Sequence, residues 1–323
     1  MPATQNGVSR QGAHVIEMQR RRLLGAVVEL ACEGGVQAVS VATICARAGV
    51  SRRTFYDLFA DRDDCLQVAF QDAVDTARNA VVQAVRDQYD QGMPGGQKAP
   101  GWTDSVRTGL STLLSLLDQE PGMARLLILD GPGFGPKALE VRGRVLAEAA
   151  LAIDRGRAEA KAGREPPPLT AEGTVGAVLS VIHTRLLQND PHPLTQLTGS
   201  LMALIVHPYL GAAAARRELD RDVHVEPIRV RKLPADPFKD LPIRLTYRTA
   251  LVLSSIAQSP GSSSRQVADA SGITDPGQIS RLLTRLRTTG LIQDDGIGPT
   301  KGMARAWSLT ERGEGVLQAT GQV

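Results

Sequence analysis

The stretch from Val41 to Leu66, VATICARAGVSRRTFYDLFADRDDCL, decides the fold of the N-terminal part of this chain. It predicts a short helix that Ser40 caps, a tight turn at Ala48-Gly49-Val50, and a second helix that opens at Ser51. Two helices joined in this way form a helix-turn-helix, whose second helix enters the major groove of DNA. We therefore expect the N-terminal part to bind double-stranded DNA.

The second helix of this unit separates its apolar and polar residues. Phe55, Leu58 and Phe59 fall at i, i+3 and i+4, so they should face the core. Arginines in the first turn can reach guanine edges with two hydrogen bonds or hold phosphates, although a solvated surface pair is the alternative. The residues that we expect to contact DNA here are Ser40, Arg52, Arg53, Thr54, Tyr56 and Arg62.

A second unit of the same kind lies near the other end of the chain, from Gln266 to Leu291. Helices are predicted at 243–258, 264–271 and 276–289, followed by a β-hairpin or wing that returns through Ala306–Leu309 and by a final helix from about Thr310. From Leu241 onward there are nine Arg and Lys against six Asp and Glu, a net charge of +3. The residues expected to reach DNA here are Gln278, Arg281, Arg285, Lys301 and Arg305, and a solvated polar face is the alternative.

Composition narrows the class of protein. At 323 residues the chain is long enough for two or three domains, and 42% hydrophobic residues are enough for sizeable cores. Only 3% of residues are aromatic, while Ala, Leu, Val and Arg are abundant, which suits a mainly helical protein. No apolar run approaches the ~18 residues that span a membrane, and no apolar segment marks a secretory signal. We expect a cytoplasmic protein that does not bind membranes.

The middle of the chain shows helical periodicity throughout. A long helix should run from about Asp63 to Gln91, and the later helices should span 102–119, 121–130, 136–162, 169–188 and 194–219, the last one kinked or interrupted by Pro208. The predicted domains are a disordered arm (1–14), a DNA-binding domain (15–66), a helical domain (67–225), a Pro-rich linker (226–242) and a small C-terminal domain (243–323).

Catalytic signals are missing from the sequence. No nucleophile is paired with a base, and Cys32, Cys45 and Cys65 fall in no metal-binding or CxxC spacing. We read the cysteines as small buried side chains, with a thiol sensor as the alternative. The expectation is a protein that is not an enzyme and that uses no cofactor or metal.

The N-terminal unit resembles the DNA-binding domain of the TetR family of regulators. The resemblance rests on the Ser40 cap, Ile44-Cys45, the turn Ala48-Gly49-Val50-Ser51, and the pair Tyr56 and Phe59, and it extends to Leu66. Three positions depart from the family pattern: Cys45 stands for alanine, Cys65 for leucine with Leu66 beside it, and Arg62 for lysine. Arginine keeps the charge but changes the geometry of a phosphate contact.

The resemblance implies a helical domain that dimerises through its last two helices and holds a ligand cavity. The helices 169–188 and 194–219 would form a four-helix bundle in a homodimer, through apolar stripes at Val175, Val178, Leu179, Ile182 and Leu186 and at Leu197, Leu201, Leu204 and Ile205. An ordinary intramolecular core is the alternative. The candidate ligand-binding residues are Trp102, Met123, Leu127, Phe134 and His183, which are also candidates for the core or the interface.

The C-terminal run from GQISRLLTRLRTTGLI to WSLTERG resembles winged-helix domains of the MarR kind. The expected fold is therefore all-α, an N-terminal helix-turn-helix with a helical ligand and dimerisation domain, followed by a small α+β winged-helix domain. The implied function is a ligand-responsive transcription factor, a homodimeric repressor that binds a pseudo-palindromic operator and an unidentified small-molecule effector. The alternative is an interaction protein whose winged helix binds a protein partner.

Overall fold

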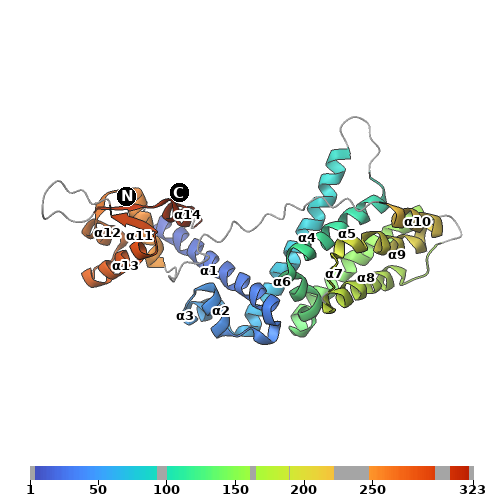
Figure 1. The fold of residues 1–323 in the computed structure, drawn as a ribbon, viewed down its shortest axis with the longest axis horizontal. Coiled ribbons are helices and arrows are strands. Elements are labelled where there is room, and N and C mark those ends of the chain that lie inside the picture. The colour runs from blue at the N-terminus through green and yellow to red at the C-terminus, as the bar shows by residue number, and fades with distance from the viewer. Residues whose placement is uncertain are drawn as a thin grey trace. The chain divides into compact units, whose positions relative to one another are not determined.

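The computed structural model describes residues 4–92, 100–160, 165–188, 190–221, 247–294 and 306–319. The chain divides into two compact units. Figure 1 labels their helices. Unit 1 comprises Met1–Ala26, Val41–Leu58 and Arg231–Val323, and unit 2 comprises Val27–Ser40 and Phe59–Val230. Each unit is mostly helical, as expected, and the strands lie in the C-terminal part of unit 1.

The N-terminal elements follow the predicted helix-turn-helix. Helix α1 (Thr4–Gly34) leads through a short 3-10 turn, η1 (Val36–Ala38), to α2 (Val41–Ala48) and α3 (Arg52–Leu58). The prediction of a disordered arm over 1–14 differs from the structure, in which α1 already begins at Thr4. Extending a helix that is already nucleated fixes only one residue per added hydrogen bond, so a segment without an apolar stripe can still be helical.

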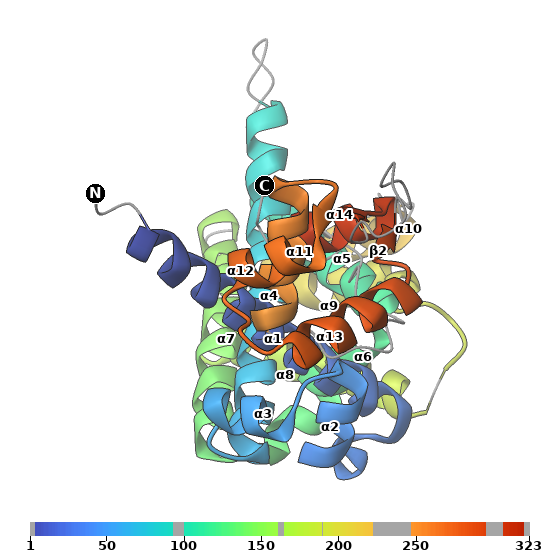
Figure 2. The ribbon, with the colours of Figure 1, turned by 90° about the vertical axis from the view of Figure 1, so that its left-hand side faces the viewer.

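The C-terminal part of unit 1 combines helices with a three-stranded antiparallel sheet. Its elements are α11 (Tyr247–Gln258), β1 (Ser262–Ser263), α12 (Ser264–Ser271), α13 (Pro276–Thr288), β2 (Ile292–Asp294), β3 (Ala306–Leu309) and α14 (Glu311–Ala319) (Figure 2). The strand order is β1-β3-β2, with Ser262 opposite Trp307 and Ile292 opposite Leu309. The short strand β1 had no sequence signal.

Helix boundaries in this part have visible causes. Ser263 caps α12 in a capping box with Gln266, and Asp275 caps α13 by accepting a hydrogen bond from the Gly277 amide. The core gathers buried apolar residues from every helix and from β2 and β3, including Leu253, Leu283 and Trp307. The expected linker, 226–242, lies outside the described residues.

Unit 2 is a helical bundle. Its elements are α4 (Arg62–Gly92), α5 (Trp102–Gln119), α6 (Pro121–Ala124), the π-helix η2 (Arg125–Asp130), η3 (Gly131–Gly133), α7 (Pro136–Asp154), η4 (Arg155–Glu159), α8 (Thr170–Leu187), η5 (Leu194–Leu197), α9 (Thr198–Leu210) and α10 (Ala212–Asp220). The pairs α4 with α5, α7 with α8, and α9 with α10 pack together (Figure 1).

Three predicted helices of unit 2 are interrupted. The segment expected as one helix over 121–130 forms one α-helical turn and then a π-helix, and the helix expected to reach residue 162 ends at Asp154. Pro208 lies inside α9 without interrupting it, although its ring nitrogen cannot donate the amide hydrogen bond that this turn would otherwise contain. The break falls at Gly211, whose φ of 83° ends the helix.

Polar anchors hold the bundle together. Arg107 on α5 forms a buried ion pair with Glu218 on α10, at 2.7 Å between Nη2 and Oε2, and also donates to the Glu218 backbone oxygen at 2.9 Å. Asp118 at the end of α5 accepts hydrogen bonds from the amides of Leu194 and Thr195, which fixes the start of η5. Both contacts join segments that are far apart in sequence.

The apolar stripes of α8 and α9 pack inside unit 2. Val175 and Ile182 are buried in its core, and Val178, Leu179 and Leu186 pack against that core. On α9, Leu201 and Ile205 are buried, whereas Leu204 is 42% exposed. Val175, Ile182, Leu201 and Ile205 therefore serve the intramolecular core, whereas Val178, Leu179, Leu186 and Leu197 are half-buried and Leu204 is exposed, so a dimer contact through these five stays a prediction.

Candidate nucleic-acid interface

Helix α3 presents the predicted polar face to solvent. Phe55 is fully buried, while Arg52 and Arg53 are exposed and Tyr56 is 58% exposed. Thr54 is half-buried. The structure thus confirms how the helix is turned and places three of the predicted DNA-contacting side chains on its open face.

The start of α3 is fixed by Ser51, a residue that we had not assigned a role in the site. Its Oγ accepts a hydrogen bond from the Thr54 amide at 3.0 Å and lies 2.8 Å from the Thr54 hydroxyl. This is a side-chain N-cap, which satisfies an amide that the helix itself leaves unpaired. The cap sets Arg52 and Arg53 in the first turn of α3. The sequence signal for this cap was a serine, Ser51, three residues before Thr54.

The arginines of α3 are free for an external partner. Among the described residues, neither Arg52 nor Arg53 makes a hydrogen bond or an ion pair. The only acid on α3 is Asp57, which is exposed, so the helix carries a net positive charge. Unpaired guanidinium groups at a helix surface suit phosphate oxygens or guanine edges.

The turn between α2 and α3 depends on Gly49. Its φ is 64°, and its amide donates to the Ala46 oxygen at 3.3 Å. A Cβ atom at this position would lie 3.2 Å from Nη2 of Arg22 on α1. Glycine is therefore favoured both by the left-handed backbone and by the space available.

The two remaining predicted residues of this unit are placed differently. Ser40 is exposed just before α2. Arg62 is half-buried and donates from Nη2 to the Val36 backbone oxygen at 3.2 Å. The Arg62 guanidinium is thus engaged inside unit 2, whereas we had expected it to reach outward to a phosphate.

Helix α13 is arranged like α3. Ile279, Leu283 and Leu286 are buried as predicted, and Arg281 and Arg285 are exposed. Gln278 is half-buried, and Arg281 donates to the Gly277 backbone oxygen at 3.1 Å. No acidic residue occurs between Pro276 and Gln293 in the sequence. Lys301 and Arg305 lie outside the described residues.

The predicted ligand-binding residues differ in burial and in the contacts that they make. Trp102 and Leu127 belong to the core cluster of unit 2, and the Trp102 indole donates to the Ala152 oxygen. Phe134 packs edge-on against Phe70, and Met123 is half-buried. His183 is exposed on α8. Trp102, Leu127 and Phe134 thus make packing contacts, and ligand binding by the five residues stays a prediction.

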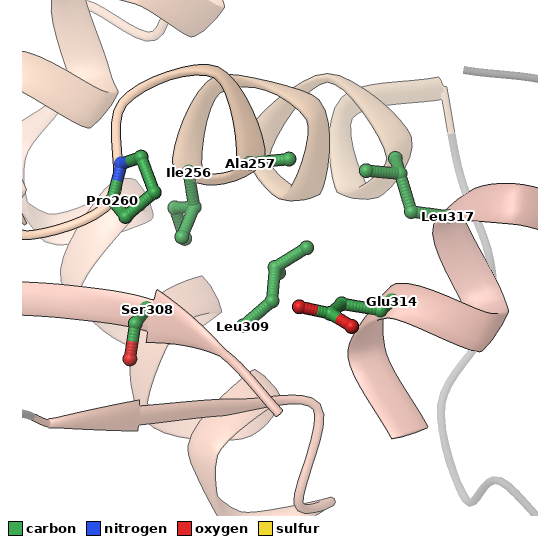
Figure 3. Close-up of a pocket in the computed structure, with 7 residues that line it drawn as sticks. All are labelled: Ile256, Ala257, Pro260, Ser308, Leu309, Glu314 and Leu317. Carbon is green, nitrogen blue, oxygen red and sulfur yellow. The ribbon is translucent and has the colours of Figure 1, made fainter. Parts of the chain in front are cut away.

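A small pocket lies elsewhere, in the C-terminal part of unit 1 (Figure 3). It has a volume of about 250 Å³ between the end of α11, β3 and α14, and its lining includes Ile256, Leu309 and the Glu314 carboxylate. This volume is below the ~300–1,000 Å³ of typical ligand sites. No group of three or more His, Cys, Asp or Glu residues within the described ranges could hold a metal ion.

Cys45 and Cys65 are buried free thiols, as expected, while Cys32 is exposed. No helix in the described ranges is long and apolar enough to cross a membrane.

Residues 23–69, which contain α2 and α3, match the family model of the bacterial regulatory proteins of the TetR family. No curated protein matches the sequence.

Similar solved structures cover 58–66% of this chain. The fatty acid degradation regulator FadR from Bacillus halodurans is 19% identical, with 58% of this chain and 94% of that chain covered and a TM-score of 0.49. A TetR family transcription regulator from Marinobacter aquaeolei VT8 is 21% identical, with 60% and 96% covered and a TM-score of 0.45. RolR in complex with resorcinol is 20% identical, with 66% and 98% covered and a TM-score of 0.45.

Proposed function

We propose that this chain is a DNA-binding transcriptional regulator of the TetR type that reads its operator with α3. The observation that carries the proposal is the open face of α3, where Arg52, Arg53 and Tyr56 are exposed on a helix whose start is capped by Ser51. The match of residues 23–69 to the TetR family model supports the same assignment. Catalysis has no part in this proposal.

The proposed active form is a homodimer that binds a pseudo-palindromic operator, because two recognition helices then meet successive major grooves about 34 Å apart. The supporting observation is the outer face of α8, where Gly173, Gly176, Ser180 and Thr184 are exposed and Leu187 is 64% exposed. A Cβ added at Gly173 or Gly176 meets no atom within 4 Å. An uncharged face of small residues lets a helix of a second copy approach closely.

As a regulator of this type, the dimer would act as a repressor that responds to a small-molecule effector bound by unit 2. Binding would weaken operator affinity by favouring a different spacing of the two recognition helices. This part of the proposal rests on the family resemblance alone, and the effector is unassigned.

The second recognition element is α13, which we propose as an additional DNA reader in a winged-helix arrangement. Its exposed arginines, in a stretch with no acidic residue from Pro276 to Gln293, favour a polyanionic partner. The strands that follow α13 belong to a sheet with the order β1-β3-β2, and this arrangement is compatible with a wing. A protein partner for this part of the chain is the competing proposal, and an acidic surface on that partner would be required.

The test is selection of duplexes from a random-sequence DNA library by the full chain. The wild type should enrich a two-fold symmetric sequence, and the variant Arg52→Ala/Arg53→Ala should not. Arg86→Ala, which removes an exposed arginine from α4, is the matched control and should enrich the wild-type sequence. Enrichment of the same sequence by the double variant would show that α3 is not the reader. The variant Arg281→Ala/Arg285→Ala then tests α13, since it should shorten the selected sequence.

A further inference from the structure

We propose that Arg62 and Arg125 are positioning residues for the DNA-binding helices, because together they fix the connection through which the chain enters α2. This inference rests on the proposed DNA-binding function and adds two residues that act without touching DNA. The observation that carries the inference is that two guanidinium groups from different elements of unit 2 meet adjacent residues of this connection. The Arg125 guanidinium lies against Gly35, and the Arg62 guanidinium donates to Val36.

Arg62 binds the connection from the first residue of α4. Its Nη2 donates to the Val36 backbone oxygen at 3.2 Å, and this oxygen also accepts the Val39 amide at 3.2 Å. The same carbonyl therefore closes the η1 turn and anchors it to α4. A hydrogen bond with a charged donor is stronger than one between neutral groups, so this anchor is stronger than an ordinary turn contact.

Arg125 approaches the preceding residue from the π-helix η2. Its Nη2 lies 2.7 Å from the position that a Gly35 Cβ would occupy, and Gly35 has a φ of 67°. The Arg125 Nε lies 3.3 Å from the Asp130 carboxylate, five residues later. A π-helix bonds residues five apart, so this local geometry places Asp130 where it can orient the guanidinium. Single π-helical turns occur frequently at functional sites.

The element that carries Arg125 has little freedom to move. A Cβ at Gly122 would lie 2.6 Å from the Val28 backbone oxygen on α1, and one at Gly131 would lie 2.3 Å from the Phe70 ring on α4. Contacts this close leave no space for a side chain at Gly122, in the turn before η2, or at Gly131, directly after it. Arg125 is therefore held by a segment that is itself packed tightly between the C-terminal end of α1 and α4.

The clamp reaches the DNA-binding helices through the chain. The turn η1 ends at Ala38, and α2 begins at Val41. Specific binding requires both recognition helices of a dimer to meet their grooves in register, whereas attraction to phosphates alone tolerates a loose orientation. If the clamp is lost and the competent orientation falls to about a tenth of the population, the apparent Kd for the specific site rises about tenfold.

The experiment compares full-length Arg62→Ala and Arg125→Ala with the matched control Arg78→Ala, whose arginine forms an exposed ion pair with Glu148 in the same unit. The probes are the duplex that the wild-type chain selects from random DNA and a scrambled duplex of equal length. Both clamp variants should raise the Kd for the selected duplex about tenfold and change that for the scrambled duplex less than about twofold. Amide exchange at 36–39 should become faster, and Arg125→Lys should give an intermediate result.

The proposal would be overturned if the ratio of the Kd for the scrambled duplex to the Kd for the selected duplex were the same in the clamp variants as in Arg78→Ala. So would an equal loss on both duplexes with a lowered Tm, since that pattern belongs to a residue with only a structural role. If the wild type selects no duplex, the proposed function itself fails. Amide exchange at 36–39 that is unchanged in both clamp variants overturns the positioning role by itself, so the two failures are distinguishable.

Discussion

The buried ion pair between α5 and α10 offers the sharpest test of how unit 2 is held together. Arg107 and Glu218 have side chains only 10% and 9% exposed, and the Arg107 Nε donates to Glu218 Oε2 at 2.7 Å. The variant Glu218→Ala leaves the guanidinium buried with only the backbone oxygen of residue 218 as a partner. Removing one member of a buried pair costs about 3–5 kcal/mol, so we expect a loss of about 3 kcal/mol or more.

The assay is denaturation of the full chain, followed by Trp102 fluorescence in a Trp307→Phe background so that the signal comes from unit 2 alone. At about 2–4 °C per kcal/mol for a unit of this size, Tm should fall by about 6–12 °C. The variant Arg107→Met/Glu218→Leu, which removes both charges, should be much closer to the wild type.

The control for this prediction lies beside the buried pair. Asp104 on α5 pairs with Arg221 at 2.9 Å, and these side chains are 42% and 48% exposed. Asp104→Asn should therefore change stability by less than about 1 kcal/mol. The reasoning is refuted if Glu218→Ala is as mild as Asp104→Asn, or if the double replacement destabilises the protein as much as Glu218→Ala does.

Three further predictions concern single positions. Gly49→Ala places a Cβ in a left-handed turn with little space, so it should lower the free energy of unfolding by about 1–2 kcal/mol and abolish operator selection. A variant as stable as the wild type would contradict this prediction. Gly176→Arg should give a monomer in sedimentation, because the new side chain meets open space within one copy; Gly143→Arg on α7, equally unobstructed, should leave the dimer intact. Burial and the Asp154 carboxylate raise the pKa of Tyr209 to about 12, so the folded state keeps a proton that the unfolded state loses above its usual pKa of about 10. The stability of unit 2 should fall from about pH 10 to 12, and Tyr209→Phe should remove that component of the fall.

The local parts of the fold were predictable because their signals are local. The bounds of α2, the burial of Phe55 and the exposure of Arg52 and Arg53 follow from a turn glycine and from apolar spacing over a few residues. The order of α12, α13 and the returning strand β3 was also readable, since caps and turns separate them.

Long-range contacts were not predictable from one sequence. Arg107 and Glu218 are 111 residues apart, and nothing local to either residue indicates the other. Val175 and Ile182 on α8 lie in the intramolecular core, which the sequence could not distinguish from a dimer contact because an apolar stripe looks the same in both. The sequence predicted that Arg62 contacts a phosphate, whereas in the structure it donates to the Val36 backbone oxygen. A backbone oxygen leaves no mark in the sequence, so this partner could not be predicted.

The central claim, that α3 reads DNA through its first-turn arginines, is tested most directly by the salt dependence of binding. The measurement is the Kd of the wild type and of Arg52→Ala/Arg53→Ala for the selected duplex across a range of salt concentrations. If both arginines contact DNA, the affinity should fall by about 1–3 kcal/mol per arginine that reads a base, and each arginine on a phosphate should lower the salt slope by about 1. An unchanged Kd and an unchanged slope would contradict the account, since both side chains would then be solvated surface residues.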